Sequence, residues 1–469
     1  MTILRSAAAG LALLLAAACT APTPPRSQAS TAAGSACAPP QAPPEAETAA
    51  TIDVVEQAYF CILGNYYSGA TLDARSLLTA GFLALTQELN RDGRDVPEAI
   101  MPALTGDRKA DWAAFEAAHR KTTDQVPDLR DKLTVVTLEA LVAALGDNHA
   151  RWTHDVKRPP DYYDGDGYGV GFQANVNGPQ ADGNVALAPL FVTTVQGGAA
   201  QAAGLRPGDV IESINGSAPF IDGTPTPAIA ALYPRYPEAR PVQLRLLRQT
   251  TGRRWTVTLK PGLYPRDPAT LRVVRSKLLD DVAYVRLTGF TPDSANRVLK
   301  AISRLRTGRT LSGVVLDLRG NGGGSPVEAT RLLSAFVHGK ITAYQCTVDG
   351  RCATARTDDT VELLNLPLVV LIDRSCASAC EHVSSAVKDL RLGQLVGTRT
   401  AGVISGPAQS YLLANNTILS FPARHHLGPN REVIDRIGVP RDHHVPLTPE
   451  DAAAGRDPAL AKALTLLHK

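Results

Sequence analysis

The C-terminal half of the sequence constrains the fold most, because short, continuously apolar segments alternate there with amphipathic ones. The apolar segments predict buried strands and span residues 282–290, 311–321, 366–373 and 393–398. The amphipathic segments predict helices and span residues 294–306, 327–337 and 379–390. Strands that are apolar on both faces need cover on both sides. From about Leu271 to Lys469 we therefore expect a layered α/β core.

Two other patterns precede this core. Over residues 51–155 the apolar residues recur at helical spacing with few Gly or Pro, which predicts a small domain of roughly three to five helices. Residues 160–262 are β-rich, and alternation in 241–249 and 253–260 is typical of antiparallel strands. The segments Gly204–Ile211 and Ile214–Gly216 resemble those of a PDZ domain. A closed module that only holds two domains together is the alternative.

The resemblance to a PDZ domain implies a peptide-binding loop. Gly169, Val170, Gly171 and Phe172 would point backbone N–H groups at the terminal carboxylate of a peptide, which would add a strand to the sheet edge. Glycines suit such a loop because the chain must turn tightly with its amides unobstructed.

The N-terminus predicts export. Residues 1–18 hold one arginine and then an apolar run that is short for a membrane span and typical of a signal peptide. Three alanines before Cys19 resemble a bacterial lipobox, although Ala16 stands where leucine is usual; an ordinary cleaved signal peptide is the alternative. Residues 19–50 are rich in Ala, Pro, Ser and Thr and predict a disordered tether. We expect a lipid-anchored protein on the outer side of a bacterial membrane.

Six cysteines remain if Cys19 carries lipid, and an even number in an oxidising compartment favours disulfides. Cys346 and Cys352 are expected to close a local loop, whereas Cys376 and Cys380 are near enough to pair with each other. The full connectivity stays open. A zinc site is disfavoured because the paired C-x2-C spacing is absent, and four further histidines lack ordered carboxylate partners: His425, His426, His443 and His444.

Ser378 stands at the expected start of the helix 379–390 and has two explanations. With Glu381 it fits the S-x-x-E capping box. A serine at a helix N-terminus also has amides and the positive dipole end beside its oxygen, which suits a nucleophile. The glycine loop 320–324 does not match the G-x-G-x-x-G pattern of dinucleotide-binding sites, and no Walker lysine follows it. Its backbone amides are more suited to facing an anion such as an oxyanion.

The order of these motifs resembles the carboxy-terminal processing, or tail-specific, serine peptidases. The resemblance rests on Asp317–Gly324, on Cys376–Glu381 and on the upstream PDZ-like and helical segments. It implies a core related to the crotonase and Clp protease spirals, Ser378 as the nucleophile, and the amides of Ala379 and Gly323 as oxyanion donors.

One departure concerns the catalytic base. The family usually has lysine where this chain has Val403, and Lys388 lies ten residues along the helix from Ser378, about 15 Å away. The segment around His149 resembles instead the base of the branch that includes tricorn protease. In that branch an acidic residue before a Gly-Val-x-Pro-Asp segment completes the Ser-His-acid site. Asp435 stands in this position, and Glu432 is the second choice for the acid. Neutral imidazole can accept the serine proton, while the acid fixes its tautomer.

The sequence thus predicts an exported serine endopeptidase acting on proteins or peptides with a free C-terminus, without metal or other cofactor. A net charge of +3 over 469 residues gives no reason to expect nucleic acid as a partner. A non-catalytic lipoprotein of the same fold that holds peptides or apolar ligands is the alternative, and Val403 is its best support.

Overall fold

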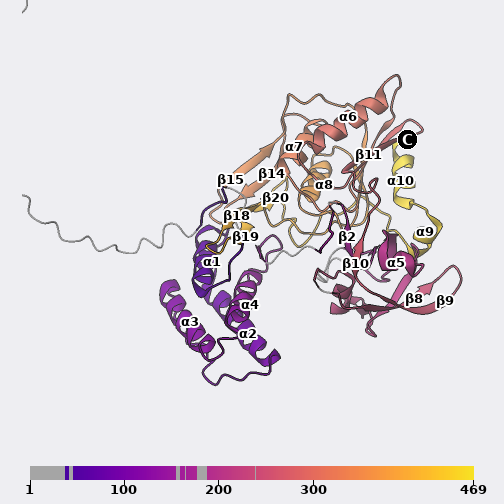
Figure 1. The fold of residues 1–469 in the computed structure, drawn as a ribbon. Coiled ribbons are helices and arrows are strands. Elements are labelled where there is room, and N and C mark those ends of the chain that lie inside the picture. Colours follow the sequence, from indigo (N-terminus) through magenta and orange to yellow (C-terminus); the bar gives the residue numbers. More distant parts are fainter. Residues whose placement is uncertain are drawn as a thin grey trace, which may run out of the picture.

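The computed structural model describes residues 37–41, 46–154, 159–163, 165–176, 187–237 and 239–468 (Figure 1). The predicted signal peptide, Cys19 and most of the predicted tether lie outside these residues. Within the described part of the chain, no helix has both the length and the apolar character needed to cross a membrane.

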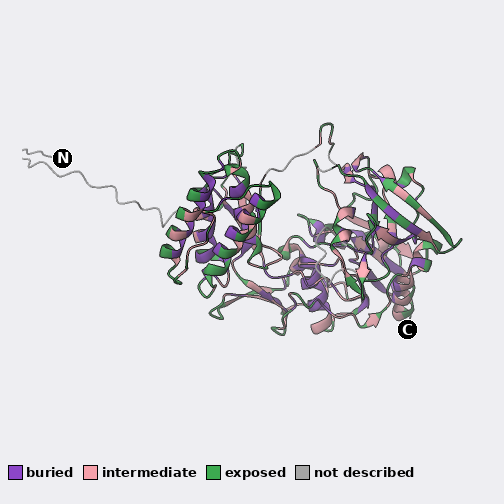
Figure 2. Ribbon diagram, turned by 90° about the horizontal axis from the view of Figure 1, so that it is seen from below, coloured by how far each residue is buried: buried purple, intermediate pink, exposed green. Residues whose placement is uncertain are grey.

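The N-terminal part holds four helices, which Figure 1 draws in indigo and purple. They are α1 (Ile52–Asn65), α2 (Ala74–Arg91), α3 (Arg108–Thr123) and α4 (Arg130–Ala143). Their inward faces are buried, as Figure 2 shows, around large side chains such as Tyr59, Phe115 and Leu138. Apolar burial of this kind is what stabilises short helices in water.

A small sheet joins these helices to the core. Strand β1 (Arg151–Thr153) pairs antiparallel with β19 (Ile418–Pro422), which pairs with β18 (Ala408–Leu412). Trp152 on β1 and Phe421 on β19 belong to the same apolar cluster as the helices. Because β1 is fixed in this sheet, the loop between α4 and β1 is held against the C-terminal half of the chain.

The module that resembles a PDZ domain has its own apolar core, which includes Val170, Phe172, Ile214 and Leu244. Its regular elements are β2 (Gly167–Gly169), β3 (Phe172–Ala174), β4 (Val192–Val195), α5 (Gly198–Ala202), β5 (Val210–Ile214), β6 (Phe220–Ile221), β7 (Thr224–Pro225), the 3-10 helix η1 (Pro227–Leu232), β8 (Val242–Arg248), β9 (Arg253–Leu259) and β10 (Gly262–Tyr264). Strands β8 and β9 are antiparallel, as their alternation predicts.

A six-stranded sheet forms the core, in the order β11–β12–β13–β16–β17–β21. Only β11 runs antiparallel to its neighbour. The strands are β11 (Val274–Leu279), β12 (Val282–Leu287), β13 (Gly313–Asp317), β16 (Leu368–Ile372), β17 (Gln394–Gly397) and β21 (His443–His444).

Helices cover both faces of this sheet. Val314 and Leu316 point to one apolar cluster, which α6 (Ser294–Arg306), α7 (Pro326–Ser334) and α8 (Ala379–Asp389) complete. Val315 and Val369 point to the other, which α10 (Pro458–Leu467) covers. The predicted layered α/β core is therefore confirmed. The turn that carries Ser378 leaves the carboxyl end of β16, and the glycine loop leaves that of β13 beside it.

The remaining elements are β14 (Ile341–Cys346), β15 (Cys352–Arg356), β20 (His425–Leu427) and α9 (Pro449–Ala454). The described residues contain three disulfides. Cys346–Cys352 joins β14 to β15 and Cys376–Cys380 spans the turn that carries Ser378, as expected, while Cys37–Cys61 ties the N-terminal segment to α1.

Candidate active site

Ser378 lies at the N-cap position of α8 with φ 56° and ψ −119°, a backbone conformation that non-glycine residues rarely adopt. Its backbone N–H donates to Glu381 Oε2 (3.2 Å), so the residue helps to begin the helix. Its side-chain oxygen lies 3.3 Å from His149 Nε2. Ser378 and Glu381 form the capping box that the sequence predicts, and the position of the hydroxyl is also compatible with the predicted role of nucleophile.

His149 comes from the loop between α4 and β1, far from Ser378 in the sequence. Its Nδ1 lies 2.6 Å from Asn148 Oδ1 and 3.2 Å from Ser405 Oγ. The Ser405 hydroxyl donates its only hydrogen to Asp147 Oδ1 (2.6 Å), so both neighbours of Nδ1 act as acceptors. The proton of neutral His149 therefore sits on Nδ1, and the lone pair of Nε2 faces Ser378.

Burial lowers the pKa of His149 below its ordinary value, while the charges of Asp147 and Asp435 act in the opposite direction. Asp147 is itself held by Tyr66, whose hydroxyl donates to its Oδ2 (2.9 Å), and it accepts the His149 backbone N–H (2.8 Å). Hydrogen bonds thus hold both the backbone N–H of His149 and its ring Nδ1. The ring is in the neutral form, which can accept a proton at Nε2.

Asp435 is connected to His149 through Asn148. Asp435 Oδ1 accepts from Asn148 Nδ2 (2.9 Å) and from the Ile404 N–H (3.2 Å). Within the described chain, no direct hydrogen bond joins Asp435 to His149. The arrangement is a relay of serine, histidine, asparagine and aspartate rather than a direct triad.

Glu432, the reserve acid, is directed elsewhere. Its Oε2 accepts from the Asn430 N–H (2.9 Å) in its own loop. Burial and the neighbouring Asp389 raise the pKa of Glu432 to about 7. Among the described residues it makes no hydrogen bond to His149.

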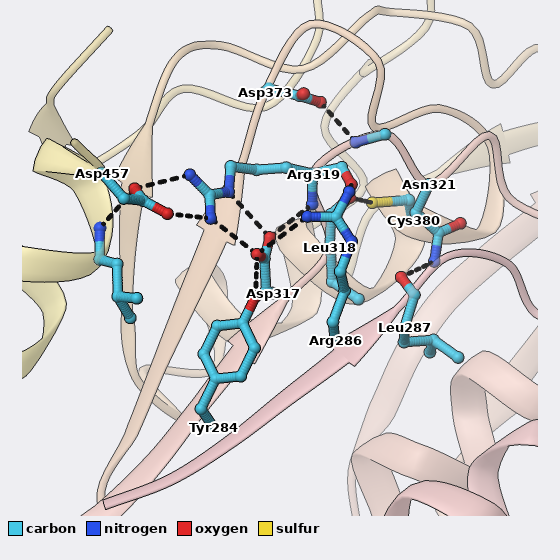
Figure 3. A network of polar contacts seen from close by, with 12 residues as sticks. Tyr284, Arg286, Leu287, Asp317, Leu318, Arg319, Asn321, Asp373, Cys380 and Asp457 are labelled. Carbon is cyan, nitrogen blue, oxygen red and sulfur yellow. Dashed lines mark hydrogen bonds and ion pairs between the residues drawn. The ribbon is translucent and has the colours of Figure 1, made fainter. Parts of the chain in front are cut away.

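A polar network holds the base of the glycine loop (Figure 3). Buried Asp317 accepts from Arg319 (2.7 and 2.9 Å) and from the Tyr284 hydroxyl (2.7 Å), and Arg319 continues to Asp457. Asp373 Oδ1 accepts the N–H groups of Gly320 (3.1 Å) and Ser375 (2.9 Å). Asp373 therefore ties the glycine loop directly to the turn that carries the nucleophile.

The predicted oxyanion donors both lie beside Ser378, but only one amide is free. A Cβ on Gly323 would lie 2.7 Å from Ser378 Cβ and 3.0 Å from the Ala379 nitrogen, so glycine is required there. The Gly323 N–H donates to Asn321 Oδ1 (2.8 Å). The Ala379 N–H, in the first turn of α8, has no acceptor among the described residues.

The turn that contains Val403 is fixed by Glu381. The Glu381 carboxylate is buried and accepts from the Thr400 hydroxyl (2.6 Å) and from the amides of Gly402 (2.6 Å) and Val403 (2.8 Å). Val403 O in turn accepts the Ser378 N–H (2.8 Å). Lys388 Nζ contacts Asp442, away from the nucleophile.

A cavity of about 190 Å³ opens beside Ser378. Its lining residues come from α7, α8, β14, β18, β20, the loop between α4 and β1, and the loops that precede α7 and β18: His149, Gly324, Pro326, Gln345, Ser378, Ala379, His382, Ile404, Gly406, Pro407, Ala408 and His426. The loop Gly169–Phe172 is not part of this lining; Val170 and Phe172 pack in the core of the module that resembles a PDZ domain.

The sequence did not single out Asp147, Asn148 or Ser405. Asp147 and Asn148 are polar neighbours of His149 in the chain, which is a signal that could have found them. Ser405 carries no such signal, because only the packing of the loop after Val403 places it at the ring.

Comparisons with known proteins show which families and folds the chain is similar to. Residues 281–445 match the model of peptidase family S41, and residues 163–232 match that of the PDZ domain. Carboxyl-terminal-processing peptidase 2, chloroplastic, of Arabidopsis thaliana is 28% identical over 337 residues, covering 68% of this chain and 62% of that protein. The carboxyl-terminal-processing protease of Synechocystis sp. is 29% identical over 330 residues, covering 66% of this chain and 71% of that protein.

Among solved structures, mature CPAF has a TM-score of 0.51 at 12% identity, covering 83% of this chain and 98% of that one. At this identity the likeness concerns the fold alone. The alignment with the Arabidopsis protein spans less than two thirds of that protein's length.

Proposed function

We propose that this chain, whose core belongs to peptidase family S41 and follows a PDZ domain, is an exported serine endopeptidase that cleaves protein or peptide substrates near their C-termini. The observation that carries the proposal is the 3.3 Å approach of His149 Nε2 to Ser378 Oγ, with the Nε2 lone pair directed at the hydroxyl. It also answers the doubt raised by Val403, because a proton acceptor stands beside Ser378 without a lysine.

In the proposed reaction His149 Nε2 takes the Ser378 proton as the oxygen attacks the scissile carbonyl carbon. The Ala379 N–H donates to the developing oxyanion. The Gly323 N–H, bonded to Asn321 Oδ1 in the free protein, would be shared with the oxyanion.

The imidazolium that forms then gives its proton to the leaving amine, and an acyl-enzyme remains on Ser378. Water, deprotonated by His149, attacks the acyl carbonyl; the bond to Ser378 Oγ then breaks, His149 returns the proton to this oxygen, and the second product leaves as a carboxylic acid. While the ring is charged, Asn148 and Ser405 hold Nδ1–H, and the charges of Asp147 and Asp435 favour the imidazolium.

Substrate delivery is assigned to the PDZ domain. The amides of Gly169–Phe172 would bind the C-terminal carboxylate, and the peptide would pair with the sheet edge. Export follows from the N-terminal pattern and agrees with the disulfides, and Cys19 would carry the lipid.

Hydrolysis of an unfolded protein by the purified chain tests the enzyme directly. Fragments should appear with the wild type and with the surface control Ser303→Ala, and should be absent with Ser378→Ala and His149→Ala. A peptide whose C-terminus is amidated should be cleaved more slowly than its free-acid form. Wild-type protein that binds such peptides without cleaving them would overturn the proposal in favour of a binding lipoprotein. For the lipid anchor, a Cys19→Ser variant that still fractionates with the membrane would refute the assignment of Cys19.

A further inference from the structure

The cavity beside Ser378 has an apolar wall and a polar end. Pro326, Ile404, Pro407 and Ala408 supply apolar surface, whereas Gln345, His382 and His426 supply polar groups. The lining, within the described part of the chain, includes no Asp, Glu, Lys or Arg. A side chain that enters this cavity therefore meets hydrogen-bonding groups and no fixed charge.

The polar groups converge from three elements. Gln345 on β14 and His426 on β20 are direct cross-strand partners, so their side chains lie on the same face of the sheet. His382 comes from α8, one turn after Ser378, and its ring lies 5.4 Å from that of His426. One member of the cluster, His382, thus lies on the helix that begins at Ser378.

The hydrogen bonds of His382 define its tautomer. His382 Nε2 lies 2.9 Å from Thr342 Oγ1, and the Thr342 hydroxyl donates its hydrogen to Ala355 O (3.2 Å). Thr342 must therefore accept from His382, which places the ring proton on Nε2. His382 Nδ1 is then a buried acceptor without a donor among the described residues.

His426 Nε2 is a second buried nitrogen without a partner in the described part of the chain. Both histidines are almost fully buried, and burial lowers the pKa of each, to about 4 for His382. Both rings are accordingly neutral at physiological pH. Leaving two polar atoms unpaired costs stability, which is a reason to ask what group would satisfy them.

We infer that this cavity is the pocket for the substrate residue before the scissile bond (P1), and that it selects an uncharged carboxamide side chain, glutamine or asparagine. The inference rests on the proposed function. His382 Nδ1 and His426 Nε2 are covered in the free protein, so a carboxamide would reach them only when the two rings turn toward the cavity; it would then donate to His382 Nδ1 and accept from the amide of Gln345. A P1 carboxylate would meet the lone pair of His382 Nδ1, and a P1 lysine or arginine would find no counter-charge.

The test uses one peptide series that differs only at P1, with Gln, Asn, Ala, Leu, Glu or Lys followed by a fluorogenic amine. In the wild type kcat/KM for Gln and Asn should exceed that for Ala and Leu by about tenfold or more, as expected for pairing buried polar groups. His426→Leu should reduce this preference to about threefold or less and raise the rate with Leu at P1.

His425→Leu is the matched control. His425 directly precedes His426 on β20, does not line the cavity and stacks on Tyr67. It should keep the wild-type preference. His426→Leu should fold, since among the described residues it removes an unpaired nitrogen and no side-chain hydrogen bond. His382→Leu is the second probe, and His426→Gln should restore part of the preference.

Labelling of Ser378 by a fluorophosphonate, read by intact mass, separates the two proposals. If Ser378 is labelled but cleavage does not depend on the P1 residue, the pocket assignment is wrong while the proposed peptidase activity holds. The same conclusion follows if the preference for Gln and Asn persists in both leucine variants. A wild type that neither labels nor cleaves would remove both.

Discussion

Replacement of Asn148 by alanine should lower kcat/KM with little loss of stability. Asn148 Oδ1 is the nearest acceptor of His149 Nδ1–H, at 2.6 Å, and its amide connects the ring to Asp435. In Asn148→Ala the ring keeps only the weaker contact to Ser405 Oγ at 3.2 Å. If Asp435 were the direct partner of His149, Asn148 would be dispensable.

The size of the effect follows from the charge on the ring. A hydrogen bond to a charged group contributes about 1.5–3 kcal/mol, and this bond is charge-assisted once imidazolium forms. At about 1.4 kcal/mol for each factor of ten, Asn148→Ala should lower kcat/KM by roughly 10- to 150-fold. If Ser405 is removed as well, Nδ1–H has no acceptor and the ring proton is no longer held on Nδ1. In a comparable triad, loss of the correct tautomer lowers kcat by about 10⁴-fold.

The assay is hydrolysis of one fluorogenic peptide, with thermal unfolding measured on the same samples. Asn296→Ala, an exposed substitution on α6, is the matched control and should be neutral. A fully active Asn148→Ala protein would refute the relay. So would an Asp435→Asn protein that is at least 10⁴-fold impaired while Asn148→Ala is not, because that pattern belongs to a direct triad.

Three further predictions concern the surroundings of the site. In the pH profile of kcat/KM, the acid limb should lie below the ordinary histidine pKa. The variant Asp147→Asn should move this limb to lower pH, because the charge of Asp147 raises the pKa of His149. A limb at the same pH in the variant would contradict this coupling. Glu381→Gln should lower the free energy of unfolding by about 1–3 kcal/mol, because an amide would face N–H donors of the turn. Burial raises the pKa of Glu381 from 4.5 to about 7, so its contribution to stability is full below pH 4.5 and lost as pH rises through about 7, a dependence that should vanish in the variant. Loss of both Cys376 and Cys380 as alanines should lower the free energy of unfolding by roughly 2 kcal/mol and slow Ser378 labelling; unchanged labelling would show that the bridge does not position the nucleophile.

The regular elements of the core could be predicted from the sequence because their signals are local. The strand 313–317 is apolar up to its last residue, Asp317, and leads into a glycine loop, and α8 begins at a serine with a glutamate three residues later. The pairing of β19 with β1 could not be predicted in this way. That pairing joins segments more than 260 residues apart, and it depends on packing around Trp152 and Phe421 rather than on any periodicity.

The candidate site shows the same division. His149 was predicted from a motif, and the structure brings it to 3.3 Å from Ser378. Asp435 was predicted by its place before a Gly-Val-x-Pro-Asp segment, but sequence spacing carries no information on which atom fills the gap to the ring. Asn148 fills that gap because the loop after α4 turns its amide between the two groups. The occupation of the Gly323 N–H by Asn321 likewise depends on backbone geometry.

The central claim is that His149 is the base that activates Ser378, and the rate of Ser378 modification by a fluorophosphonate measures this most directly. We expect the rate to rise with pH through a single ionisation below the ordinary histidine pKa, and to lose both its speed and that ionisation in His149→Gln. A modification rate that is equally fast in His149→Gln, or that never rises across this range in the wild type, would contradict the account.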